Sequence, residues 1–181
     1  MVLIAMGSMV YGIDGFAVAP GPDGCPHAEN PAVRSSTPMT TALIASGIRL
    51  SPTFADQVRD LADTDVVALV EPRISFPLEL DGYLVFRSAT SACRYVQVFY
   101  NANLSERRAI SIIGHELRHA FEIGMHPEVV DAASMRTMYR MYGELGEGGE
   151  DRYESPEAYA AGRTILQELL NGTSSRAAPA R

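Results

Sequence analysis

Two histidines and a glutamate form the part of the chain with the clearest chemistry. His115 and His119 lie four positions apart, and Glu116 directly follows the first of them. On a helix, successive residues are rotated by about 100°, so the two imidazoles lie about 40° apart on one face and one turn apart along the axis. This spacing lets both rings bind a single tetrahedral Zn²⁺ ion. The sequence therefore predicts two zinc ligands.

Glu116 lies one position around the helix from the first histidine, beside the predicted metal rather than on it. Zn²⁺ with three protein ligands and one open position lowers the pKa of bound water to roughly 7. A neighbouring carboxylate can take the proton of that water. The pattern H-E-x-x-H is typical of zinc peptidases, and we predict Glu116 to be the catalytic base.

The flanking residues predict the helix that this geometry needs. Ser105 is a candidate N-cap and Gly124 a candidate C-terminal stop. Four apolar residues follow a helical repeat on the side nearly opposite the histidines: Ile110, Ile113, Leu117 and Phe121. We expect this stripe to pack on the core.

A catalytic zinc ion needs a third protein ligand. In gluzincins, a glutamate on or just before a later helix supplies it. Glu154 lies just before the Ser-Pro start of the last predicted helix, and Glu157 lies inside that helix beside small residues. Both glutamates are candidates.

The extended metzincin pattern H-E-x-x-H-x-x-G-x-x-H is not met. Glu122 stands where the glycine is required, and Met125 stands where the third histidine is required. His126 is displaced by one residue and remains a further candidate ligand.

The chain resembles a set of small bacterial H-E-x-x-H proteins over roughly residues 40 to 170. The matching segments are Thr53-Phe54, Asp65-Val66-Val67, Arg94-Tyr95-Val96, Val130-Asp131-Ala132-Ala133-Ser134 and Tyr153-Glu154-Ser155. The resemblance implies a minimal zincin-like domain with gluzincin-type zinc ligation. Because the family pattern keeps the glutamate of the Tyr-Glu-Ser/Thr segment, it favours Glu154 over Glu157 as the third ligand.

Other polar residues could support such a site. Tyr139, Tyr153 and His126 are candidates to stabilise the oxyanion of a tetrahedral intermediate. Asp131 is a candidate acceptor for the second ring N–H of a ligand histidine, or a carboxylate near the first turn of a helix that begins at Pro127.

Composition limits the partners. The formal charge of −7 and the pI of about 5.1 give no basic surface for nucleic acid. The apolar run near the N-terminus is about 12 residues long, too short to span a bilayer. We therefore expect neither a nucleic-acid partner nor a membrane span.

Two cysteines leave two possibilities open. Cys25 could pair with Cys93 as a disulfide in an oxidising compartment, or it could reach the zinc as an inhibitory ligand. Cys93 could equally be a small buried residue.

The rest of the pattern predicts an α+β domain of about three strands and about five helices. Gly47 is expected to stop the first helix. The predicted helices cover residues 37–46, 54–61, 105–124, 127–142 and 156–170, and the predicted strands cover residues 66–70, 82–87 and 94–100.

We expect three regions along the chain. Residues 1–36 read as a poorly ordered arm or weak export signal with a Pro/Gly-rich linker, so the location could be exported, periplasmic or cytoplasmic. Residues 37–172 read as the zincin-like metal-binding domain, and residues 173–181 as a frayed tail.

These expectations favour a zinc-dependent hydrolase, a small peptidase that acts on a peptide or protein with Glu116 as base. The strand at residues 94–100 is expected to be the edge on which an extended substrate pairs. The alternative is a zinc-binding or protein-interaction domain without activity, because a chain this short leaves little material for a second wall of a cleft.

Overall fold

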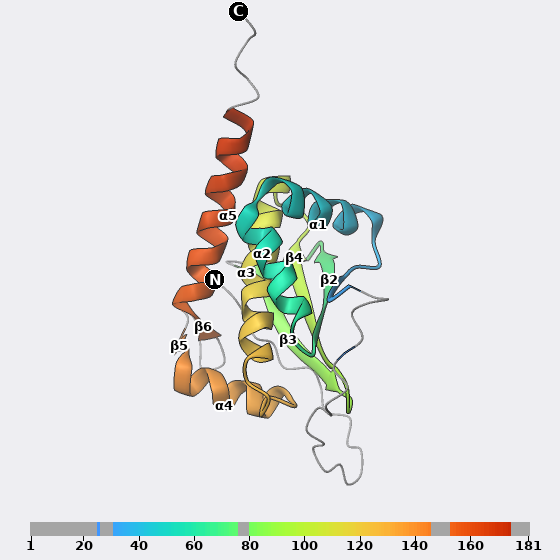
Figure 1. The fold of residues 1–181 in the computed structure, drawn as a ribbon. Coiled ribbons are helices and arrows are strands. Elements are labelled where there is room, and N and C mark those ends of the chain that lie inside the picture. Colours follow the sequence, from blue (N-terminus) through green and yellow to red (C-terminus); the bar gives the residue numbers. More distant parts are fainter. Residues whose placement is uncertain (1–24, 26–30, 76–79, 146–152, 175–181) are drawn as a thin grey trace, which may run out of the picture.

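The computed structural model describes residues 25, 31–75, 80–145 and 153–174 (Figure 1). These residues form an α+β fold with five helices, one mixed four-stranded sheet and a separate two-stranded sheet. The predicted class is confirmed.

Two short helices precede the first long strand. α1 (Pro38–Leu50) and α2 (Pro52–Ala62) each begin with a proline after a capping hydroxyl, since Thr37 accepts from the Thr40 N–H and Ser51 from the Phe54 N–H. The predicted stop at Gly47 is wrong, because α1 continues to Leu50. A Cβ at Gly47 would lie 2.9 Å from the ring of Phe54, so this glycine allows the two helices to pack closely.

The main sheet has the strand order β1-β2-β4-β3. β1 (Val33–Arg34), β2 (Val66–Arg73) and β4 (Arg94–Asn101) are parallel, whereas β3 (Gly82–Ala89) pairs with β4 in an antiparallel hairpin. The sequence predicted a sheet of about three strands, and the main sheet has four. β1 lies within the segment 1–36, and its two residues are too few to show an alternating pattern.

α3 (Glu106–Gly124) carries the H-E-x-x-H pattern and lies across one face of this sheet (Figure 1). Ile110, Ile113 and Leu117 are buried, as predicted. The opposite face of α3 is buried as well, because α5 (Pro156–Ser174) packs along it. The two histidines therefore do not face open solvent.

α4 (Ala132–Tyr142) begins five residues later than predicted. Asp131 is its N-cap and forms a capping box with Ser134, whose backbone N–H lies 2.7 Å from the aspartate Oδ1. Pro127 lies in the preceding turn. The capping box, rather than the proline, sets the start of the helix.

A buried arginine fixes the C-terminal end of α3. Arg94 pairs with Asp65 and donates to the backbone oxygens of Ile123, Gly124, His126 and Val129. The last carbonyls of α3 lack intrahelical partners, so the guanidinium satisfies them and complements the negative end of the helix dipole.

Cys25 and Cys93 form a disulfide across 68 residues. This settles the choice left open by the sequence, because Cys25 has no free thiolate to bind a metal. The export-like residues 1–24 and the tail residues 175–181 lie outside the described part of the chain, whereas residues 173 and 174 belong to α5. No helix within the described ranges has the length and apolar character required to cross a membrane.

Candidate metal centre

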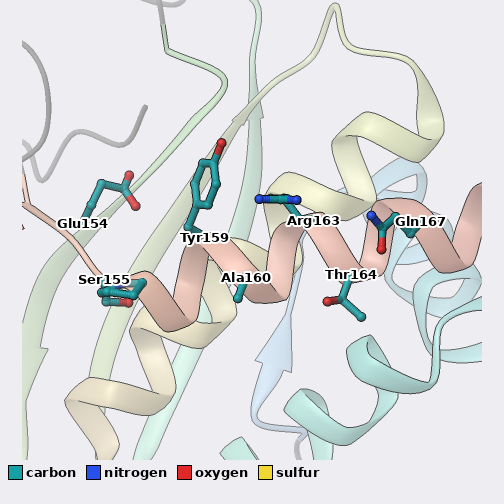
Figure 2. Close-up of a pocket in the computed structure, with 8 residues that line it drawn as sticks. Glu154, Ser155, Tyr159, Ala160, Arg163, Thr164 and Gln167 are labelled. Atoms are coloured by element: carbon teal, nitrogen blue, oxygen red, sulfur yellow. The ribbon is translucent and has the colours of Figure 1, made fainter.

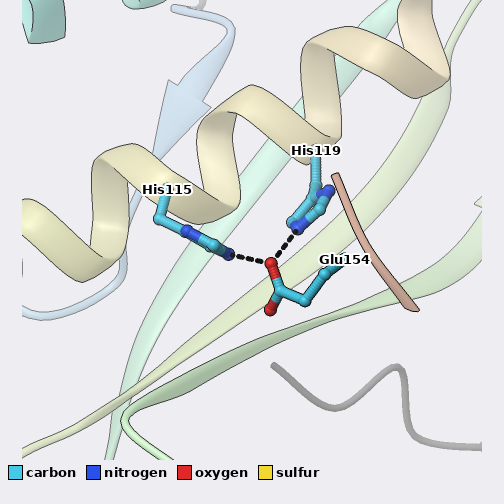
Figure 3. Close-up of side chains that lie close together, drawn as sticks. All are labelled: His115, His119 and Glu154. Atoms are coloured by element: carbon cyan, nitrogen blue, oxygen red, sulfur yellow. Dashed lines mark ion pairs between the residues drawn. The ribbon is translucent and has the colours of Figure 1, made fainter. Parts of the chain in front are cut away.

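Three side chains from two distant parts of the chain meet on the buried side of α3 (Figure 3). His115 and His119 project from successive turns of α3, and Glu154 comes from β6 (Tyr153–Glu154), which pairs with β5 (Glu144–Leu145). Glu154 Oε2 lies 3.3 Å from His115 Nε2 and 3.9 Å from His119 Nε2. One ligand atom from each residue lies within 4.8 Å of the others.

Close packing of α5 on α3 places Glu154 there. A Cβ at Gly162 of α5 would lie only 3.2 Å from the Cβ of His115, and the hydroxyl of Ser111 donates to the carbonyl of Gly162 at 2.9 Å. The absence of a side chain at Gly162 thus allows the two helix backbones to approach beside the first histidine.

The atoms that face one another suit a metal ion. His115 Nε2, His119 Nε2 and both carboxylate oxygens of Glu154 are buried without a hydrogen-bond partner among the described residues. Ligand atoms around a tetrahedral Zn²⁺ lie about 3.3 Å apart, so slight rotation of the side chains would complete the set. Buried polar atoms without partners are costly, and a cation would satisfy these four.

Glu116 adds a fourth ionisable side chain, which is fully buried, beside this cluster. Its side chain is 0% exposed, and neither carboxylate oxygen has a hydrogen-bond partner in the described structure. Burial raises the pKa of Glu116 to about 8, and the nearby Glu154 carboxylate contributes in the same direction. Gly82 of β3 borders it, because a Cβ there would lie 2.8 Å from Glu116 Oε1.

The carboxylate of Glu122 orients the His119 ring by contacting Nδ1, the nitrogen on the side away from Glu154. Glu122 Oε2 lies 2.9 Å from His119 Nδ1 and accepts a hydrogen bond from the Tyr139 hydroxyl at 3.1 Å. Burial would raise the pKa of Glu122, but its contacts with His119, Ser155 and Tyr139 lower it, so this carboxylate is ionised and can only accept. His119 therefore carries a proton on Nδ1, and Nε2 is the ring nitrogen on the side of Glu154.

The charges of the cluster are coupled. Burial acts to lower the pKa of both histidines, and the pKa of His115 is lowered as a result. At His119 the hydrogen bond and the charge of Glu122 outweigh burial, so its pKa is raised. Burial would raise the pKa of Glu154, but its contact with His115 lowers it below the usual range. The third candidate ligand is thus held in the ionised form that binds metal.

The other candidates from the sequence lie elsewhere. Glu157 is exposed and outside the cluster, and His126 Nδ1 contacts Glu128 at 2.9 Å. The Tyr139 hydroxyl contacts the Nδ1 side of His119, away from the ligand atoms, and the Tyr153 hydroxyl accepts from Arg140 at 3.0 Å. The hydroxyls of both tyrosines are therefore hydrogen-bonded to other side chains, Tyr139 to Glu122 and Tyr153 to Arg140.

Of the two roles predicted for Asp131, that of an acceptor for a ligand histidine is wrong, and that of a carboxylate at the start of a helix is confirmed. Its carboxylate accepts from the Ser134 N–H at the start of α4, and Glu122 takes the position behind a ligand histidine instead. The sequence did contain an indication of the contact between Glu122 and His119, because residues three apart on a helix lie on the same face. The contact of Ser155 with Glu122 had no comparable signal, since 33 positions separate the two residues.

A cavity of about 680 Å³ adjoins Glu154 along α5 (Figure 2). Tyr159 and Arg163 line it, and both project to the side of the helix on which Glu154 lies. The Arg163 guanidinium lies 5.8 Å from the centre of the Tyr159 ring. The cavity thus adjoins one of the three candidate metal ligands, Glu154.

Comparison of the chain with models of protein families, with curated proteins and with solved structures gives no match. The function is therefore inferred from the residues of the site and their geometry.

Proposed function

We propose that the protein is a zinc-dependent hydrolase, a small peptidase with gluzincin-type ligation and a zincin-like fold. The observation that carries this proposal is the meeting of His115, His119 and Glu154, each with unpartnered ligand atoms, beside the buried carboxylate of Glu116. Two imidazoles and one carboxylate are a ligand set that suits zinc and leaves a fourth position open.

The residues of the chain divide the chemistry between them. When bound, Zn²⁺ supplies a Lewis acid that polarises a peptide carbonyl and lowers the pKa of water to roughly 7. Glu116 takes the proton of the attacking water and then gives it to the departing amine nitrogen. Its two oxygens have no hydrogen bond to another described residue that would have to break first.

The strand that would bind substrate differs from the expected one. β4 lies between β2 and β3, so it has no free edge, and the prediction for residues 94–100 is wrong. β3 is the terminal strand on the side of Glu116, and Gly82 brings its backbone close to that carboxylate. An extended peptide that pairs with β3 would pass beside the catalytic base.

Replacement of Glu116 by Gln tests this mechanism. The substitution preserves shape but removes the base, so we expect stoichiometric zinc with peptide cleavage reduced at least about 100-fold. The measurement is turnover of a peptide library by zinc-loaded protein, with Glu157→Gln as the matched control. Equal rates for Glu116→Gln and the unsubstituted protein would contradict the mechanism.

One observation favours the alternative, a zinc-binding domain without activity. His115, Glu116 and His119 are all 6% exposed or less, which is tight for a site that must admit substrate. A fourth protein ligand would indicate a structural site, but the described residues offer three, and Cys25 is in a disulfide. Zinc-loaded protein that cleaves nothing in a peptide pool would support the alternative.

A further inference from the structure

Glu122 contacts both parts of the chain that carry the candidate ligands. Its Oε2 lies 2.9 Å from Nδ1 of His119 on α3. Its Oε1 accepts a hydrogen bond of 2.6 Å from the hydroxyl of Ser155, the residue that directly follows Glu154. The Glu122 carboxylate therefore links α3, which carries the two histidines, to the junction between β6 and α5.

Ser155 lies at that junction and makes two hydrogen bonds there. It is 6% exposed, and while its hydroxyl donates to Glu122, its oxygen also accepts from the Ala158 N–H at 3.0 Å. A hydroxyl has one proton and two lone pairs, so both bonds form at once. The first turn of α5 and the strand that carries Glu154 are thus fastened to α3 at the same point.

Apart from its ion pairs with the two histidines, the Glu154 side chain is positioned through its backbone. Its carboxylate oxygens make no hydrogen bond among the described residues, and within those residues its strand pairs with the two-residue β5. A hydrogen bond between Ser155 and Glu122 ties the end of this short strand to α3 beside the histidines.

We propose that Glu122 and Ser155 act as a pair of positioning residues that hold Glu154 at ligand distance from the two histidines. The inference rests on the proposed zinc site and extends it. Glu122 aligns one ligand directly and, through Ser155, places another that lies 32 positions further along the chain than itself. The two ligand-bearing elements then form one preorganised site.

The chain offers a matched control for the test. Ser51 also precedes a proline, caps a helix by accepting from the Phe54 N–H, and donates to a glutamate, Glu168. It lies at the start of α2, the described structure gives it no hydrogen bond to a residue of the candidate centre, and its partner Glu168 lies on α5 at 14 positions from Glu154. Ser51→Ala should therefore cost a comparable helix cap without moving Glu154.

The experiment measures the dissociation constant of Zn²⁺ by competition with a chromophoric chelator in the full chain. We expect Ser155→Ala to raise the constant about 10-fold, as loss of outer contacts does at other zinc sites. Ser155→Thr, which keeps the hydroxyl, should restore most of the affinity, and Ser51→Ala should leave it within about twofold. In a Glu122→Ala background, Ser155→Ala should have almost no further effect.

Two results would overturn the inference: equal zinc affinity in Ser155→Ala and Ser51→Ala, or an undiminished effect of Ser155→Ala in the Glu122→Ala background. If Glu122→Ala fails to fold, the comparison of the Ala and Thr variants at Ser155 still decides. Failure of the unsubstituted protein to bind zinc would overturn the proposed function itself, and this inference with it.

Discussion

At the scale of single residues, the candidate site combines a buried carboxylate without a hydrogen bond and an imidazole that other side chains align. Glu116 has no hydrogen-bond partner among the described residues and is fully buried, an arrangement that costs stability in a protein without metal. His119 is the opposite case, because Glu122 and Tyr139 both contact its Nδ1. Burial without partners at Glu116 therefore costs stability, whereas the contacts at His119 stabilise its orientation, and both features fit the proposed site.

The cost at Glu116 predicts a pH dependence in metal-free protein. Its pKa is about 8 when folded and near 4.5 when unfolded, so between these values the folded state holds a proton that the unfolded state releases. The free energy of unfolding should fall as pH rises through this window, by at most about 1.4 kcal/mol per pH unit. Below about pH 4.5 Glu116 is protonated in both the folded and the unfolded state, so its ionisation no longer lowers the free energy of unfolding.

Urea unfolding of chelator-treated protein at pH 5 and pH 8 measures this effect. Glu116→Gln cannot ionise, so the variant should lose less stability between the two pH values than the unsubstituted protein does. Identical losses would contradict the buried, unpaired state of Glu116.

The sequence could predict the residues of the site where their roles follow from short spacing. His115, Glu116 and His119 share one helix, and their arrangement follows from its geometry. Glu154 could be chosen over Glu157 only through a resemblance, because ligation by a distant element depends on how α5 docks. The link between Glu122 and Ser155 depends on the same docking and could not be predicted.

At the scale of elements, the approach of α5 to α3 sets the geometry of the candidate centre. Gly114 and Gly162 lie at this contact, where a Cβ would meet Ile165 at 2.3 Å and His115 at 3.2 Å. The sequence indicated neither role. A glycine inside a helix reads as a weak point or a stop, as Gly47 also did, and only the packed structure reveals a close contact.

Gly162→Ala should therefore weaken zinc binding. The added methyl group meets the rigid Cβ of His115 and forces α5 away from α3, which moves Glu154 relative to the histidines. We expect the dissociation constant of Zn²⁺ to rise on the order of 10-fold, measured by chelator competition.

Gly172→Ala is the control for that prediction. It lies on the same helix, but a Cβ there meets nothing within 4 Å. It should leave zinc affinity unchanged and stabilise the helix by up to about 1 kcal/mol. Equal zinc affinity in both variants would contradict the role of close packing at Gly162.

At the scale of the whole molecule, the sheet and its hairpin support α3, while the disulfide fastens a distant residue to the start of β4. Cys25 and Cys93 are 68 positions apart, and neither belongs to the ligand cluster. The α+β class followed from the apolar pattern. The disulfide could not be predicted from two cysteines alone, because pairing depends on where the fold brings their Cα atoms.

Reduction should separate stability from metal binding. A bridge that closes a loop of this length stabilises a protein by up to about 4 kcal/mol in the chain-entropy description. Urea unfolding with and without reductant should show a loss of this order, while bound zinc stays stoichiometric under native conditions. Release of zinc on reduction would contradict the independence of the two features.

The most direct test of the account is the zinc content of single ligand variants, measured by elemental analysis of purified protein. We expect one zinc ion per unsubstituted chain and loss of most of it in His115→Ala, His119→Ala and Glu154→Ala. Glu157→Ala and His126→Ala are the controls and should keep their zinc, because neither residue lies in the cluster. Stoichiometric zinc in Glu154→Ala, or its loss in either control, would contradict the proposed centre.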